Sequence, residues 1–180
     1  MTNIAYLSLG SNIEPETNLR TALELLAAQT RLISVSSVWE TRPAGLGGQP
    51  NFLNAAAVVE TDLTAEQLKQ EVLVSIEKRL GRVRQADKYA ARPIDLDIIL
   101  FNQDVFELGN RHIPDPEIVE RPFVAIPLAE IAPDYKHPEL GQTISEIARR
   151  FEVNKEEMYL RPDVSQSIKH LKRNGHNHKL

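Results

Sequence analysis

The chain has 180 residues and a formal net charge of −4 at pH 7, with 42% hydrophobic and 26% charged residues. These values are typical of one globular domain that buries a core, and the acidic balance argues against a general nucleic-acid binder. The absence of cysteine excludes disulfides and thiolate metal sites. No apolar run is long enough to span a bilayer and no basic-then-apolar leader opens the chain, so we expect a cytoplasmic protein that does not engage membranes.

Strand and helix patterns alternate in the first third of the chain. Residues 4–9 form an apolar run that ends at a Gly-Ser-Asn turn signal, which predicts a buried strand. Apolar residues then recur at helical spacing over residues 15–30. Residues 31–41 alternate and are rich in β-branched side chains, so they are predicted to form a second strand. A Pro/Gly-rich loop at 42–50 leads to a third strand at 53–61.

The next segment repeats the pattern. Thr64 and Gln67 fit a capping box that opens a helix, and Gly81 is placed to end it. A polar loop at 82–93 precedes a fourth strand at 94–101. Beyond it we expect a hairpin within 102–113, a short helix at 143–150, and a polar, flexible tail at 156–180, which leaves residues 1–155 as the folded domain.

The order strand–helix–strand–strand–helix–strand predicts the fold class. Two strand–helix–strand units whose inner strands pair form an α/β (α+β) sandwich of the ferredoxin-like type, with helices on one face of an antiparallel sheet. The preference for right-handed crossovers supports this arrangement. The residues after the fourth strand are then C-terminal additions to the sandwich.

A pair of acidic residues in the fourth strand is the first candidate site. Strand alternation places Asp95 and Asp97 on one side of the strand. The opposite, apolar side is predicted to consist of Ile94, Leu96, Ile98 and Leu100. Two carboxylates at a strand end suit Mg²⁺, although a solvent-exposed strand end is the plain alternative. Glu77 either joins this polar site or is an ordinary acid on the helix surface.

Basic residues gather just before that strand. Residues 78–92 contain six basic side chains and only one acid, Asp87, against the acidic balance of the chain. Arginine forks match phosphate oxygens, so this loop is a candidate phosphate site, with solvated surface charge as the alternative. The sequence contains no Gly-x-x-x-x-Gly-Lys-Ser/Thr motif, which excludes a P-loop nucleotide site.

The start of the third strand offers a possible site for a flat ring. Phe52 and Asn54 should face one side and Leu53 the other. An aromatic ring beside an amide can stack on and hydrogen-bond a heterocycle. A core phenylalanine and a strand-end asparagine are the alternative, and Phe123 carries the same ambiguity.

At this point the sequence resembles a known family. Residues 88–99, KYAARPIDLDII, closely resemble the signature of 6-hydroxymethyl-7,8-dihydropterin pyrophosphokinases. The supporting matches, in the family's order and spacing over about residues 3–150, are Leu9-Gly10-Ser11-Asn12, Thr41 with Pro43 and Gly45, residues 52–56, residues 81–84, and Arg121 with Phe123.

The resemblance implies an ATP-dependent diphosphotransferase of folate biosynthesis. Such an enzyme moves pyrophosphate from ATP to the hydroxymethyl group of the pterin and releases AMP. For this chain we expect a monomer. By this likeness Asp95 and Asp97 hold two Mg²⁺ ions. The resemblance implies pterin contacts for Thr41, Pro43, Phe52, Asn54 and Phe123, catalytic roles for Arg82 and Arg92, and ATP contacts for Arg82, Arg84, Tyr89, Arg92 and Arg121.

Several positions depart from the family pattern. Asp115 follows Pro114 where the family commonly has a histidine on the ATP side, so an acid there adds repulsion toward phosphate. Tyr89 replaces a frequent tryptophan, Lys88 a frequent arginine, and Ala90-Ala91 a more rigid Gly-Pro. These departures motivate one alternative, a catalytically weak pterin- or nucleotide-binding paralogue. A two-metal nucleotidyl transferase on the same scaffold is a second alternative, and an RNA-binding sandwich is a third that lacks the expected aromatic-rich strand.

Overall fold

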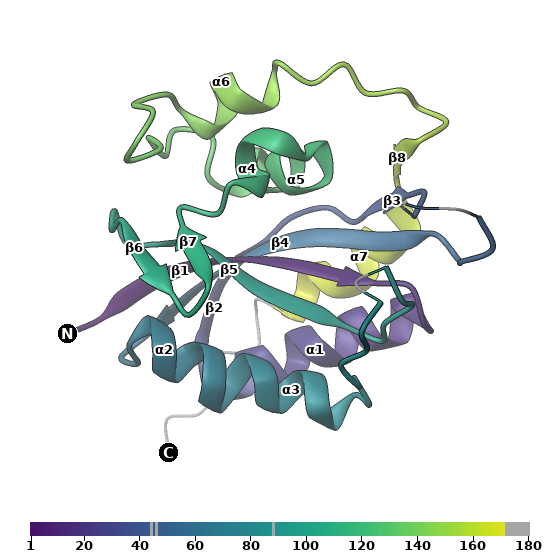
Figure 1. Ribbon diagram of the computed structural model, residues 1–180, viewed down its shortest axis with the longest axis horizontal. Coiled ribbons are helices and arrows are strands. Elements are labelled where there is room, and N and C mark those ends of the chain that lie inside the picture. Colours follow the sequence, from purple (N-terminus) through teal and green to yellow (C-terminus); the bar gives the residue numbers. More distant parts are fainter. Residues whose placement is uncertain (44, 46, 88, 172–180) are drawn as a thin grey trace.

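A six-stranded sheet with helices on both faces forms the centre of the computed structural model, which describes residues 1–43, 45, 47–87 and 89–171 (Figure 1). The strands are β1 (Asn3–Ser11), β2 (Arg31–Val35), β3 (Trp39–Thr41), β4 (Phe52–Thr61), β5 (Asp95–Phe101) and β8 (Met158–Leu160). Their order is β5-β1-β4-β3-β8, and β2 also pairs with β4. The first strands of the two predicted units, β1 and β4, pair antiparallel at the centre. The antiparallel sheet and its helices confirm the predicted fold class.

The helices of the two strand–helix–strand units share one face of the sheet. They are α1 (Pro15–Gln29) and a continuous stretch made of α2 (Ala65–Gln67), the π-helical η1 (Leu68–Leu73) and α3 (Val74–Arg79). Their buried leucines pack with β-strand residues in one hydrophobic cluster. The predicted capping box is present at Thr64, and Gly81 ends the stretch at a φ of 89°, a value that favours glycine.

The opposite face is covered by the C-terminal additions. These are α4 (Glu117–Glu120), α5 (Pro122–Ile131) and α6 (Ile144–Ala148), which lie above the sheet in Figure 1. They bury a second hydrophobic cluster against β4 and β5. The predicted hairpin is also present, as β6 (Phe106–Leu108) and β7 (Arg111–Ile113). The prediction of helices on one face therefore holds for the first two units and not for the whole molecule.

The single strand predicted over residues 31–41 is wrong. Both β2 and β3 pair with β4, but Val35 lies opposite Ala57 and Trp39 opposite Asn54, so one extra residue interrupts the pairing. Ser36 fills the interruption, because its hydroxyl accepts the Ala56 N–H at 2.8 Å in place of a backbone carbonyl. A side-chain hydrogen bond thus replaces a ladder bond, which strand periodicity does not report.

The predicted facing of the fourth strand is correct at its start and wrong at its end. Ile98 pairs with Leu7 and Leu100 with Tyr6, so Ile99 is an extra residue in the register. Ile99 and Leu100 both join the cluster under α5, and Phe101 returns to the cluster under α1. Such a bulge moves Leu100 to the face opposite to the predicted one.

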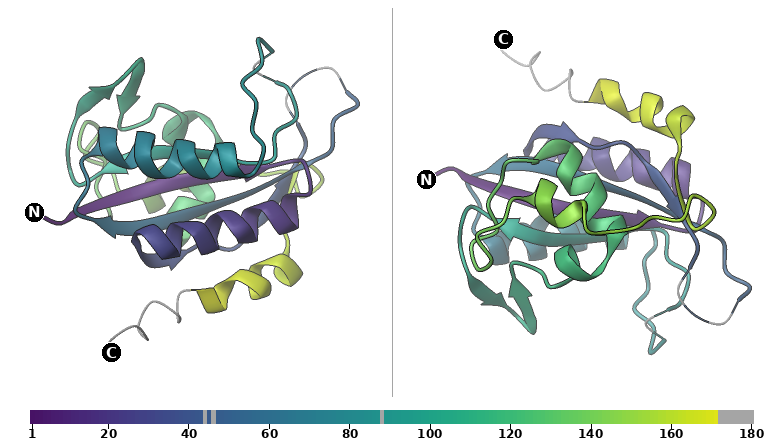
Figure 2. Two further views of the ribbon diagram at one scale, coloured as in Figure 1. Left: turned by 90° about the horizontal axis from the view of Figure 1, so that it is seen from below. Right: turned by 90° about the horizontal axis from the view of Figure 1, so that it is seen from above.

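The prediction of a flexible tail from residue 156 is wrong as far as residue 171. The chain passes from α6 around the edge of the sheet through β8 and ends on the α1 face as α7 (Pro162–Lys169), shown in yellow in Figure 2. Val164, Ile168 and Leu171 are buried in the cluster that contains α1. These positions follow i, i+4, i+7 spacing behind a helix-opening proline, a helical signal that the polar composition of the tail concealed. Residues 172–180 of the predicted tail lie outside the described residues.

Within the residues that the structure describes, no helix combines the length and the apolar character that a membrane span requires.

Candidate active site

A cavity of about 560 Å³ lies where β1, β4 and β5 approach the start of α5. Its lining brings together most of the residues that the sequence analysis proposed for a site. These are Thr41, Pro43, Phe52, Asn54, Tyr89, Arg92, Asp95, Asp97, Arg121 and Phe123. Arg82 and Arg84 are not among the described lining residues; Arg82 reaches the cavity through Asp95, whereas the exposed Arg84 does not.

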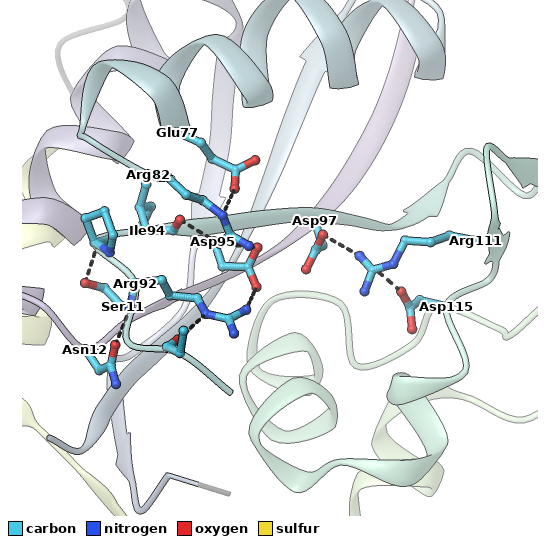
Figure 3. Close-up of polar contacts among 12 residues, drawn as sticks. Ser11, Asn12, Glu77, Arg82, Arg92, Ile94, Asp95, Asp97, Arg111 and Asp115 are labelled. Carbon is cyan, nitrogen blue, oxygen red and sulfur yellow. Dashed lines mark hydrogen bonds and ion pairs between the residues drawn. The ribbon is translucent and has the colours of Figure 1, made fainter. Parts of the chain in front are cut away.

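Asp95 lies between two arginines (Figure 3). Its Oδ1 is 2.9 Å from Nη1 of Arg82, and its Oδ2 is 3.1 Å from Nη1 of Arg92. Arg82 also donates to the Ile94 carbonyl at 3.0 Å and pairs through Nε with Glu77 at 3.2 Å. The arginine-rich loop is therefore folded back onto the acidic strand, so the two candidate groups form one charged cluster.

Glu77 belongs to this cluster and is not an ordinary surface acid. It lies at the end of the helix and is 8% exposed. Burial raises the pKa of Glu77 to about 7, and the positive charge of Arg82 opposes this rise. The second of the two readings of Glu77, as a helix-surface acid, is therefore wrong.

Asp97 is compensated by an arginine that the sequence analysis missed. Arg111 of β7 forms an ion pair with Asp97 and lies 3.9 Å from Asp115. Burial and the neighbouring Asp95 raise the pKa of Asp97, whereas Arg111 lowers it. The ion pair forms because the hairpin docks beside β5, a long-range contact without a local sequence signal.

Asp115, the departure from the family pattern, is buried with a 3% exposed surface. Its Oδ1 accepts the N–H of Glu117 at 2.9 Å, and its backbone N–H donates to the Ile99 carbonyl at 2.9 Å. The carboxylate therefore faces Arg111 and a backbone donor. Its negative charge is partly neutralised within the protein, which reduces the predicted repulsion toward phosphate.

The acidic pair fits a metal only together with further oxygen ligands. Among the described residues, no group of three or more His, Cys, Asp or Glu is arranged to hold a metal ion. Asp95 and Asp97 each keep more than a quarter of their side-chain surface exposed, on a strand end that lines the cavity. Mg²⁺ is commonly held by one or two carboxylates plus substrate phosphates and water, and this donor set meets that requirement.

The candidate ring-binding residues meet in the same cavity. Phe52 and Asn54 line it, whereas Leu53 is buried in the cluster under α1, as the predicted alternation requires. Phe123 enters from the start of α5, so the sheet and the helical layer each contribute an aromatic ring. The Asn54 amide nitrogen donates to the Thr41 hydroxyl at 2.8 Å, which directs the amide of this buried side chain.

Asn12 joins the two loops beside the cavity. This buried residue exchanges two hydrogen bonds with the backbone of Arg92, at 3.1 and 2.7 Å. Its amide nitrogen also donates to Gln49 and to the Pro50 carbonyl, each at 3.3 Å. Gln49 in turn donates to the Tyr89 carbonyl at 2.5 Å. Asn12 could not be predicted as a site residue, because its role depends on two loops that meet only in the fold.

Residues after position 150 also line the cavity, and none was predicted. They are Glu152, Val153, Asn154, Glu157 and Met158. Glu157 and Met158 lie in the segment predicted as a flexible tail, whereas Glu152, Val153 and Asn154 lie in the predicted domain, after its last predicted helix.

Comparisons with known proteins agree on one family. The family model described as 7,8-dihydro-6-hydroxymethylpterin-pyrophosphokinase (HPPK) matches residues 6–133. A 2-amino-4-hydroxy-6-hydroxymethyldihydropteridine pyrophosphokinase of Bacillus subtilis is 45% identical over 134 residues, 73% of this chain and 79% of the relative. The protein of the same name from Haemophilus influenzae is 37% identical over 150 residues, 82% of this chain and 92% of the relative.

Solved structures support the fold. A Plasmodium falciparum HPPK-DHPS structure, the wild type with SDX-DHP, matches with a TM-score of 0.67 at 19% identity. The match covers 83% of this chain and 44% of the longer one, so the chain spans less than half of that solved protein. The family model itself covers more than half of the chain, including the acidic strand and the arginine-rich loop. The chain is a member of the 7,8-dihydro-6-hydroxymethylpterin-pyrophosphokinase family.

Proposed function

We propose that this protein transfers pyrophosphate from ATP to the hydroxymethyl group of 6-hydroxymethyl-7,8-dihydropterin, a step of folate biosynthesis. The hydroxymethyl oxygen forms a bond to the β-phosphorus of ATP, and the bond between that phosphorus and the bridging oxygen of the α-phosphate breaks. AMP leaves with the bridging oxygen, and the hydroxyl proton is released. The observation that carries the proposal is that one cavity holds both the carboxylate–arginine cluster and the Phe52–Asn54–Phe123 group.

The triphosphate is assigned to the charged cluster. Asp95 and Asp97 would hold two Mg²⁺ ions, which neutralise phosphate charge when they are bound. Arg82 and Arg92 are held beside Asp95 and stabilise the charge that develops on the transferred group. Further contacts to ATP are assigned to Arg84, Tyr89 and Arg121 by the family resemblance.

The pterin is assigned to the aromatic group. Phe52 and Phe123 provide rings that stack on the flat heterocycle, and Thr41 and Pro43 lie at the same cavity. Because the Asn54 amide nitrogen is committed to Thr41, its Oδ1 is left to accept from the N–H groups on the pterin edge. That oxygen lies on the side of Gly10, another cavity residue.

The decisive experiment measures AMP release from Mg²⁺-ATP with and without the pterin. We expect AMP to form in equal amounts with the pterin diphosphate and only when both substrates are present. AMP release that does not need the pterin would contradict the proposal.

Asp115 gives a reason to keep the weak paralogue as a second candidate, because an acid occupies the position of the family's histidine. Pterin binding without AMP release would identify that case. Arg111 beside Asp115 favours the active enzyme, since it returns a positive charge to this position. Family membership leaves the nucleotidyl transferase without support.

A further inference from the structure

The segment 152–171 wraps around one edge of the sheet, and we call it the C-terminal wrap. It begins well beyond residue 133, where the family match ends. It leaves the helical layer after α6, adds β8 to the sheet and places α7 on the opposite face (Figure 2). On its way it lines the active-site cavity with Glu152, Val153, Asn154, Glu157 and Met158. The wrap therefore belongs to the wall of the site and also to the sheet.

The wrap completes the pairing of β3. This three-residue strand lies between β4 and β8, with Thr41 opposite Phe52 on one side and Met158 on the other. The Arg42 N–H continues the contact and donates to the Glu157 carbonyl at 3.3 Å. So short a strand has few ladder bonds of its own, so its position depends on both neighbours. Thr41, whose hydroxyl holds the Asn54 amide, is thus fixed in part by the wrap.

Arg161 of the wrap contacts both β3 and α1. Its Nη1 lies 2.6 Å from Glu40 of β3, and its Nη2 lies 2.8 Å from Glu16 of α1. Its backbone N–H donates to the Val38 carbonyl at 2.9 Å. Glu40 also accepts from Asn51, the residue before β4, at 3.1 Å. The guanidinium therefore connects the wrap, α1 and β3, and Glu40 extends the network to the start of β4.

The far end of the wrap is anchored in the core. The Ser165 hydroxyl accepts the Val38 N–H at 2.9 Å and donates to the Arg161 carbonyl at 2.7 Å. Val164 and Ile168 of α7 are buried under the sheet. The packing of α7 and the hydrogen bond from Ser165 thus hold the backbone of Arg161 in place. Its side chain can therefore fix the position of β3.

We propose that the C-terminal wrap helps to form the pterin-binding part of the cavity. In this proposal Arg161 is the positioning residue of the wrap. Arg161 holds Glu40 and β3, and β3 in turn holds Thr41 and the orientation of the Asn54 amide toward the pterin. The inference rests on the proposed function for the identity of the ring. It assigns Arg161 to pterin recognition alone, because its contact with Glu40 leads to β3. Its other ion pairs go to Glu16 and Asp163, and none leads to the Asp95–Asp97 cluster in the described part of the chain.

The test compares Arg161→Ala with Arg31→Ala. Arg31 is a matched control, since it also makes an ion pair between elements, with Glu60 at 3.1 Å, but on β2 at the other end of β4. We expect Arg161→Ala to raise the pterin Kd and KM by about tenfold and to change the ATP KM and kcat by less than about twofold. Arg161→Lys should recover part of the loss, because lysine keeps one ion pair and loses the fork.

Trp39 provides a readout that is independent of turnover. It is the only tryptophan of the chain and lies on β3, where its ring N–H donates to Glu130 at 2.6 Å. A displaced β3 should shift Trp39 emission in Arg161→Ala and leave it unchanged in Arg31→Ala. If Arg161→Ala melts below the assay temperature, Glu40→Gln serves instead, because it removes the negative charge from the same contact and leaves the other partners of Arg161 in place.

The outcomes separate this inference from the proposed function. Wild-type protein that binds the pterin without releasing AMP would overturn the proposed function. The pterin affinities of the variants and the wild type could still be compared. Unchanged pterin affinity in both Arg161→Ala and Glu40→Gln would overturn this inference alone. An equal rise in the KM of ATP and of the pterin would also overturn it, since it would indicate a general loss of structure. Wild-type protein that fails to bind the pterin would overturn both.

Discussion

The carboxylates of the site are paired with arginines. Asp95 has Arg82 and Arg92 as partners, and Asp97 has Arg111. If these carboxylates hold Mg²⁺, they would share it with the arginines, whose guanidinium groups would also be available to phosphate oxygens. The acids and the arginines have different proposed roles, so their removal should differ in its cost to activity and stability.

Removal of either acid should abolish the reaction and spare the fold. Asp95→Ala and Asp97→Ala are expected to lose nearly all AMP release, because each deletes one of the two carboxylate ligands offered to Mg²⁺. Their melting temperatures should stay close to that of the wild type, since both side chains are partly exposed and solvent can hydrate the freed arginines. Asp62→Ala, at an exposed acid that accepts from Thr2, is the control. Full activity in either site variant would remove the metal assignment.

Removal of Arg111 should act first on stability. Arg111→Ala leaves the Asp97 and Asp115 carboxylates without their shared cation, and Asp115 is buried. We expect a loss of about 1–3 kcal/mol in the free energy of unfolding in metal-free buffer, the cost of leaving a charged group unpaired. Added Mg²⁺ should restore part of it, which urea unfolding with and without Mg²⁺ can measure. Equal stability of variant and wild type in metal-free buffer would show that solvent already screens the pair.

Individual site residues differ in how far the sequence specifies them. Asp95, Asp97, Phe52 and Asn54 could be predicted because strand alternation fixes their side within one element. Arg111 could not, since its partner lies in another strand, and the contact depends on how the hairpin docks. The same limit applies to Asn12, whose hydrogen bonds reach two loops distant in sequence.

At the scale of elements, the β6–β7 hairpin is tied to the loop before α6 by one histidine. His112 of β7 contacts Glu107 through Nδ1 at 2.5 Å and Glu139 through Nε2 at 2.7 Å. Hydrogen bonds to Glu107, and then to Glu139, raise the pKa of His112 above its usual value. Protonation therefore strengthens the link between the hairpin and the loop.

This link predicts a pH dependence of stability. The pKa of His112 is higher in the folded than in the unfolded protein, so its stabilisation is complete below the unfolded pKa of about 6.5 and is lost as the pH rises through the folded value. The melting temperature of the wild type should exceed that of His112→Gln at acidic pH, and the gap should narrow in alkaline buffer. Burial lowers the pKa of His137 in both proteins, so taking the difference between them removes the opposite contribution that this burial makes. A gap that widens with pH would contradict the assignment.

The helix α7 should behave as part of the core. Ile168 is fully buried against the cluster under α1, and Ile168→Ala is expected to cost about 2–5 kcal/mol of unfolding free energy. Val105→Ala, at a half-exposed valine before β6, should cost far less. Urea unfolding of both variants makes the comparison, and equal small losses would mean that α7 is not docked in solution.

Helices and strands could be predicted where the spacing of apolar residues keeps one periodicity along the whole element. The segments of β1, α1, β4 and the helix over 65–79 follow from apolar spacing and from caps. The prediction failed at Ser36 and Ile99, because a single residue inserted into a sheet register leaves little trace in the sequence. It failed at α7 because the apolar residues that dock this helix are few among polar ones.

At the scale of the whole molecule, the site lies at the junction of two layers. The sheet has a hydrophobic cluster on each face, and the cavity takes residues from the sheet, from α5 and from the C-terminal wrap. A ligand in this cavity contacts parts that pack in different cores. Binding should therefore stabilise the fold as a unit and not one element.

Ligand binding should accordingly raise the melting temperature of the protein, which should still unfold in one cooperative transition. At a ligand concentration of about 100 times Kd, the gain is about 2.7 kcal/mol. We expect the pterin, with Mg²⁺ and a non-hydrolysable ATP analogue, to shift the transition without splitting it, as calorimetry can test. Adenosine with Mg²⁺ is the control, since it lacks the phosphates assigned to the charged cluster. Two separate transitions in the presence of ligand would show that the layers unfold independently.

The position of β8 late in the sequence also has a consequence for folding during synthesis. Residues 158–171 leave the ribosome after all the remaining strands of the sheet have been synthesised. Until then β3 has β4 as its only neighbouring strand, although the rest of the domain is already able to fold. The residues proposed to bind the triphosphate lie earlier in the chain, between residues 77 and 121. The nascent chain would thus contain the residues proposed for the nucleotide before Met158 completes the cavity wall beside those proposed for the pterin. Premature termination before residue 158 would yield a protein with an open sheet edge, exposed to pairing with other chains.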